Sequence, residues 1–238
     1  MKTRWAFVAL AYLTLLAQSV LDNARGPAYP DILKTFDITA SRGAYLFAWA
    51  SFAGLLANLS ARYWLPRLKL LKTTILALIL MMLGTTLFGL STKIHLWLLD
   101  FASIFVGFSM GMANVSMNLL IAQGTDVVRR RQFYSGLHAV YGFGSLMTPV
   151  LLNFYLGFGH HWDSFFIVLA VLPLIPLILA AAKREEFSQS KAPDQMSSVL
   201  SAPTSALMRL LYGGVFGFYV ASEIIVSTRL VLYLNVAH

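Results

Sequence analysis

The sequence contains no cysteine and few charged residues, and both shortages narrow the class of protein. Without cysteine the chain has no disulfide framework and no thiolate metal site. Charged residues make up 12% of the chain, whereas about 25% is usual in a soluble domain. The sequence also lacks any metal-ligand spacing, nucleophile–base set or phosphate-binding loop. We therefore expect neither a soluble globule nor an enzyme, and we predict no metal and no cofactor.

Apolar residues dominate what is present. They form 58% of the 238 residues, and the mean hydropathy is +0.70. A bilayer core about 30 Å thick is crossed by roughly 20 apolar residues in helical form. Stretches of this kind predict an all-α integral membrane protein with seven spans, at residues 5–34, 42–65, 70–92, 96–123, 132–158, 162–182 and 205–235.

The basic residues lie between these apolar stretches, and they fall mostly on one side. The net charge is +8, but basic residues scattered over loops do not form a phosphate-binding face, so we expect no nucleic-acid partner. Thirteen of the 18 Lys and Arg residues lie on the side that carries the N-terminus. This bias predicts a cytoplasmic N-terminus in a plasma (inner) membrane. The alternative for residues 2–19, a cleaved signal peptide, is less favoured because the apolar run is long.

Two spans contain ionisable residues near their middle. Asp22 and Arg25 lie three residues apart in the first span, a spacing that allows them to pair. Glu223 and Arg229 lie in the seventh. Such residues are costly inside a bilayer and are functional candidates by default. We predict that Asp22, Arg25 and Arg229 contact a substrate and that Asp22 or Glu223 couples transport to protons. The alternatives are a self-neutralising pair for Asp22 and Arg25, and a residue that extends to the membrane surface for Arg229.

Polar residues at helical spacing form a second group of candidates. Asn114 and Asn118 are one helical turn apart in the fourth span, and His138 and Tyr141 are three apart in the fifth. Their hydrogen-bonding groups predict contacts with the hydroxyl groups of a substrate. The alternative is hydrogen bonding between helices, which contributes about 0.6 kcal/mol on average in membrane proteins.

Small residues recur four positions apart in two spans. Gly107 and Gly111 show this spacing, as do Ala50 and Gly54. In lipid, such pairs let two helix backbones approach closely. The pattern predicts tight packing where these spans meet.

Four segments carry motifs whose order along the chain is informative. Residues 22–30 combine an acid with Gly-Pro and a second proline, and residues 107–114 are rich in glycine. Residues 136–149 and 219–234 complete the series. Together they resemble the N-terminal six-helix half, plus the seventh helix, of a major facilitator superfamily transporter. The last two segments are most similar to the sugar-permease-like branch. The loop after the second span departs from the family pattern, because Leu59 and Arg62 match it but its acidic residue is missing.

The resemblance implies a fold and a domain organisation. Residues 1–182 would form a six-helix bundle of two three-helix repeats, and residues 183–204 a cytoplasmic linker. Residues 205–238 would be the first helix of a truncated or missing C-terminal domain. That missing half would be a partner, together with the lipid bilayer and a small polar solute.

The resemblance also implies a function. We expect a secondary active transporter that works by alternating access on a small polar solute, sugar-like and proton-coupled. The alternative is a non-transporting seven-helix membrane protein, such as a receptor or an assembly subunit. The polar linker after the sixth span and the acid in the first span favour the transporter.

Overall fold

The computed structural model describes residues 3–188 and, beyond them, residues 205, 207, 208, 211, 214, 215, 218 and 222. The chain divides into two units, residues 1–190 and 191–238, and the architecture below is that of the first. The described positions from 207 to 222 are helical. Most of the predicted linker and seventh span lies outside the described residues, as do Glu223 and Arg229.

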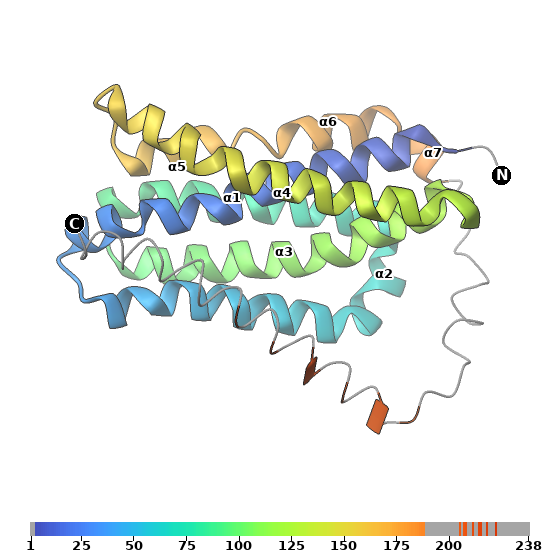
Figure 1. Ribbon diagram of the computed structural model, residues 1–238, viewed down its shortest axis with the longest axis horizontal. Helices are drawn as coiled ribbons and strands as arrows, with labels where there is room; N and C mark the ends of the chain where they lie inside the picture. The colour runs from blue at the N-terminus through green and yellow to red at the C-terminus, as the bar shows by residue number, and fades with distance from the viewer. Residues whose placement is uncertain are drawn as a thin grey trace. The chain divides into compact units, whose positions relative to one another are not determined.

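All regular elements in the described part of the first unit are helices (Figure 1). Its elements are α1 (Trp5–Phe36), α2 (Ala40–Ile94), α3 (Trp97–Gly124), α4 (Val127–Gly157), α5 (Trp162–Leu169), α6 (Leu174–Ala182) and α7 (Arg184–Ser188). Five helical stretches in this part are long and apolar enough to cross a membrane: α1, α2, α3, α4 and the α5–α6 segment, residues 162–182. The prediction of an all-α membrane protein is therefore confirmed.

The second of these stretches is interrupted. A continuous helix of 55 residues would extend about 80 Å, far more than the roughly 30 Å of a bilayer core. Lys69 breaks it with φ 62° and ψ 162°, three residues after Pro66, which has no backbone N–H to donate. Figure 1 shows two arms, residues 40–68 and 70–94, running in opposite directions. The residues predicted as the second and third spans, 42–65 and 70–92, lie within these two arms.

The backbone angles of Lys69 lie in a region that is essentially restricted to glycine and costs about 1–3 kcal/mol for other residues. Lys69→Gly is therefore expected to raise the free energy of unfolding by about 1 kcal/mol. The rest of the relieved backbone strain is offset because glycine gains more conformational freedom than lysine in the unfolded chain. Lys72→Gly, in the exposed helical turn that follows, should instead lower it by about 1 kcal/mol. Equal losses in both variants, measured by thermal unfolding in detergent, would show that Lys69 is unstrained.

Two predicted spans differ from the observed helices by more than a few residues or by a break. α4 begins at Val127 rather than near residue 132, because the side chain of Asp126 accepts a hydrogen bond from the Arg129 backbone N–H at 2.9 Å and caps the helix. The predicted sixth span divides into α5 and α6. The turn between them ends at Pro173, whose ring disfavours a helical conformation in the residue before it.

α3 contacts both arms of α2, and its packing against the first arm depends on small residues. A Cβ atom at Gly111 would lie 2.5 Å from the Gly54 carbonyl oxygen, and one at Gly107 would overlap the backbone of Ala50. From the opposite side, a Cβ at Gly54 would lie 3.1 Å from the Gly107 carbonyl oxygen. The close approach predicted from the spacing of these residues is confirmed.

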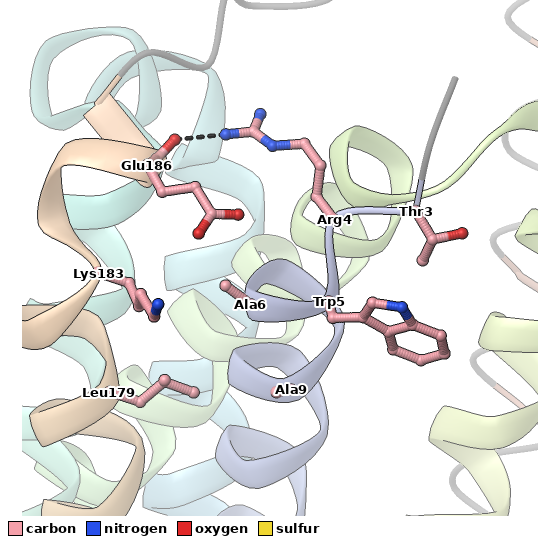
Figure 2. Close-up of a pocket in the computed structure, with 8 residues that line it drawn as sticks. All are labelled: Thr3, Arg4, Trp5, Ala6, Ala9, Leu179, Lys183 and Glu186. Atoms are coloured by element: carbon pink, nitrogen blue, oxygen red, sulfur yellow. Dashed lines mark hydrogen bonds between the residues drawn. The ribbon is translucent and has the colours of Figure 1, made fainter.

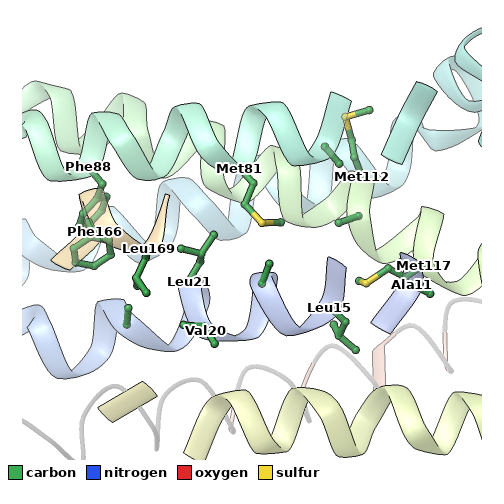
Figure 3. Packing of buried hydrophobic residues seen from close by; sticks show 14 of the residues in the cluster. Ala11, Leu15, Val20, Leu21, Met81, Phe88, Met112, Met117, Phe166 and Leu169 are labelled. Carbon is green, nitrogen blue, oxygen red and sulfur yellow. The ribbon is translucent and has the colours of Figure 1, made fainter. Parts of the chain in front are cut away.

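The hydrophobic core lies between α1, the second arm of α2, α3 and α5 (Figure 3). Phe88 and Phe166 pack with their ring centroids 4.6 Å apart, and Leu21, Met81 and Met112 are also buried in this cluster. Several buried hydroxyl groups within the helices donate to carbonyl oxygens of their own helix, as Thr85 does to Met81. Such bonds satisfy polar side chains where water is absent.

Candidate functional site

The polar centre of the first unit is built on α1. Asp22 lies near the middle of this helix and forms a salt bridge with Arg25, one turn further on. Its second carboxylate oxygen, Oδ2, accepts a hydrogen bond from the Tyr141 hydroxyl of α4 at 2.9 Å. The pairing of Asp22 with Arg25 predicted from their spacing is confirmed. Their role in substrate binding stays a prediction.

Arg25 is the most deeply buried charged residue of this centre. Its side chain is 8% exposed, whereas that of Asp22 is 29% exposed. The guanidinium carbon lies 5.6 Å from the ring centroid of Phe47, on the first arm of α2. The Nε and Nη1 atoms are buried without a hydrogen-bond partner among the described residues. A buried donor of this kind is costly unless an acceptor reaches it.

A second polar contact lies one turn before Asp22 on α1 and joins this helix to α3. The side-chain amide of Gln18 donates to Oδ1 of Asn114 at 3.0 Å. Asn114 therefore takes part in the helix-to-helix bonding that the sequence allowed as an alternative, although its side chain is still exposed. Asn118 is exposed as well and donates to the Asn114 backbone carbonyl oxygen at 2.8 Å. Asn114 is thus linked through Gln18 to the helix that carries Asp22, and Asn118 extends the polar groups one turn along α3.

The structure brings six predicted residues onto three neighbouring helices. α1 supplies Asp22 and Arg25, α3 supplies Asn114 and Asn118, and α4 supplies His138 and Tyr141. The helices are joined by the contacts from Tyr141 to Asp22 and from Gln18 to Asn114. His138 is exposed on α4, one turn before Tyr141.

Three further residues contribute to the centre or its neighbourhood and were not predicted from the sequence. Gln18 carried a usable signal, since an amide one turn before Asp22 in an apolar helix extends the same polar line. Tyr134 donates to the Asn118 backbone carbonyl oxygen at 3.1 Å, and Phe47 lies beside Arg25. No sequence signal distinguishes these two rings from the many other aromatic residues.

Two other contacts of charged side chains in the first unit lie near the ends of its helices. Arg42, in the first turn of α2, forms a salt bridge with Asp100 in the first turn of α3; the Nη1–Oδ1 distance is 3.1 Å. Asp163 accepts from Thr92 at 2.6 Å and so joins α5 to the end of α2. These contacts connect helix ends and include no member of the polar centre.

The side chains at the centre are suited to binding polar solutes. A paired carboxylate and guanidinium, a tyrosine and two exposed amides can donate to and accept from polar solutes. Among the described residues, no group of three His, Cys, Asp or Glu side chains is placed to hold a metal ion. Ionisable residues in the middle of an apolar helix are typical of substrate and ion pathways.

Comparison with known proteins agrees with a membrane protein that has a polar site inside its apolar helices. The sequence model of one family, described as Major Facilitator Superfamily, matches residues 11–238. A search of curated proteins gives no match. The family match covers nearly the whole chain, and the apolar helices fit a family of membrane transporters that is not a family of enzymes. The chain therefore belongs to the major facilitator superfamily and is an integral membrane transporter of the major facilitator kind.

Proposed function

We propose that the chain takes part in secondary active transport of a small polar, sugar-like solute by alternating access. The observation that carries the proposal is the network of Asp22, Arg25 and Tyr141 near the middle of the first unit. It continues through Gln18 to the exposed amide of Asn114. A line of polar groups on three apolar helices is of use where a hydrated solute passes between them.

The proposed layout has six crossings in two three-helix repeats. The two arms of α2 count as separate crossings, and α5 with α6 forms the last. Two equivalent contacts support the repeat. α3 packs on the first arm through Gly107 and Gly111, and α1 packs on α4, where a Cβ at Gly144 would lie 2.9 Å from the Cβ of Ser19. The charge bias of the loops supports a cytoplasmic N-terminus.

The buried donors of Arg25 support a solute with acceptor oxygens. In the observed arrangement Asp22 uses one oxygen for Arg25 and the other for Tyr141. Two nitrogens of Arg25 have no acceptor among the described residues. A hydroxyl or carboxylate oxygen of a solute would meet that requirement, while the side chains of Asn114 and Asn118 offer further donors and acceptors.

Proton binding to Asp22 would weaken the bonds that its carboxylate makes to Arg25 and Tyr141. A proton on Asp22 removes the negative charge that holds Arg25, and it frees the guanidinium for a solute oxygen. This exchange links proton binding to solute binding in one pair of residues. Glu223 stays a second candidate and Arg229 a further substrate contact; both lie outside the described residues.

The proposal is tested by solute flux into liposomes that contain the purified chain. Radiolabelled hexoses and disaccharides would be supplied with and without an inward proton gradient. Tyr141→Phe is expected to reduce the initial rate of uptake about tenfold, because one hydrogen bond to a charged group contributes roughly 1.5 kcal/mol. The unfolding temperature should fall by only a few degrees, since the ring is kept and the loss is confined to this one hydrogen bond.

Tyr155→Phe provides a matched control on the same helix. The Tyr155 hydroxyl donates to Ser164 of α5 at 3.1 Å, away from the polar centre. Its loss should leave uptake unchanged. Equal rates for both variants and the unmodified chain would remove Tyr141 from the mechanism. Binding of a solute without any flux would favour a receptor instead.

A further inference from the structure

A groove lies at one end of the first unit, where α1 begins and α6 ends (Figure 2). Asp22 lies much further along α1, near its middle. Its lining residues are Thr3, Arg4, Trp5, Ala6, Ala9, Leu179, Lys183 and Glu186. Because α1 and α6 both belong to membrane-crossing stretches, this end of the two helices lies at the boundary between lipid and water. None of these residues belongs to the proposed transport site.

The groove is apolar along the helices and basic at their ends. Ala6, Ala9 and Leu179 line its helical part, and Arg4 and Lys183 lie at the end where the helices stop. Trp5, at the same level, is 67% exposed, a position typical of tryptophan at membrane interfaces. The division into an apolar strip and a basic end matches the two parts of a phospholipid.

Arg4 is held in place before any ligand arrives. Its Nη2 atom donates to the Glu186 backbone carbonyl oxygen, and its guanidinium carbon lies 3.9 Å from the ring centroid of Phe7. Its backbone N–H donates to the Gly124 carbonyl oxygen at 2.8 Å. A fixed guanidinium binds phosphate with a smaller loss of side-chain entropy than a free one.

The charges of the groove favour an anion. Arg4 and Lys183 provide two positive charges, and the Glu186 carboxylate provides one negative charge. Figure 2 shows the side chains of Lys183 and Glu186 both turned toward α1. Glu186 therefore reduces the attraction for an anion without reversing it, and its removal should strengthen binding.

We propose that this groove binds an anionic phospholipid. The phosphate of the head group would lie against Arg4 and Lys183, and one acyl chain would follow Ala6, Ala9 and Leu179. Basic pockets between membrane helices are known to favour anionic head groups, and each basic residue near a charged surface contributes about 1 kcal/mol.

The test is a titration of the purified chain in detergent, followed by native mass spectrometry. Phosphatidylglycerol and phosphatidylcholine with identical acyl chains serve as probes. Phosphatidylglycerol should bind about tenfold more tightly than phosphatidylcholine. Lys183→Gln should weaken phosphatidylglycerol binding about fivefold, and Glu186→Gln should strengthen it by a similar factor. Lys183 is exposed, so its replacement should not disturb folding.

Lys93→Gln is the control for net charge, since Lys93 is an exposed lysine in the last turn of α2. It should leave both affinities unchanged. The proposal is overturned if the two lipids bind equally, if Lys93→Gln matches the loss seen with Lys183→Gln, or if Glu186→Gln weakens binding. Displacement of phosphatidylglycerol by millimolar inorganic phosphate would also overturn it, because the groove would then be a site for free anions.

Discussion

Gly107→Ala is expected to lower the free energy of unfolding by about 3 kcal/mol, the upper end of the usual cost of overpacking. The added Cβ would overlap the backbone of Ala50. A flexible side chain could move aside, but here two helix backbones would have to separate. Thermal unfolding of the purified chain in detergent, followed by circular dichroism, measures the loss.

The same substitution at Gly142 separates this contact from the general effect of a methyl group on a helix. A Cβ at Gly142 meets no atom within 4 Å, and the residue lies inside α4. Alanine in a helix interior is favoured over glycine by roughly 0.5–1 kcal/mol, so Gly142→Ala should be neutral or stabilising. If both variants unfold at the same temperature, α3 does not depend on its close approach to α2.

Gly107 also illustrates what the sequence predicts well. The spacing of small residues can be read from the local sequence alone, because it indicates only that one face of a helix is flat. The structure joins the flat faces of α2 and α3, and nothing in the spacing identifies them as partners. The apolar spans were predictable for a similar reason, since their lengths follow from the thickness of a bilayer.

The ends of the helices were less predictable, because single residues decide them. The basic residues 129–131 favoured a loop, yet Asp126 satisfies the first backbone N–H groups and allows α4 to begin before them. Pro173 divides the sixth span although the hydropathy of residues 162–182 is uninterrupted. In both cases a local hydrogen bond or its absence overrides the apolar pattern.

The ion pairs show a further limit. Asp22 and Arg25 lie one turn apart, so their pairing follows from helix geometry alone. Arg42 and Asp100 are 58 residues apart, and their contact exists only because α2 and α3 begin at the same end of the bundle. The hydrogen bond from Tyr141 to Asp22 depends in the same way on the packing of α1 against α4.

Asp22→Asn is expected to abolish proton-driven uptake and to lower the free energy of unfolding by about 3 kcal/mol. Arg25 would then keep a buried charge without its partner, and breaking one half of a buried pair typically costs about 3–5 kcal/mol. The lower end of this range applies because the Asp22 side chain is 29% exposed. Uptake into liposomes and thermal unfolding measure the two effects separately.

Two further variants separate function from stability. Asp100→Asn breaks the other salt bridge, whose side chains are 33% and 20% exposed; it should cost about 1 kcal/mol or less and leave uptake unchanged. The double variant Asp22→Asn with Arg25→Gln removes both buried charges, so it should recover most of the lost stability while uptake stays abolished. Recovery of uptake in the double variant would mean that the pair only neutralises itself within α1. Continued loss of uptake in a stably folded double variant would instead mean that the solute or the proton requires these charges, since the fold no longer does.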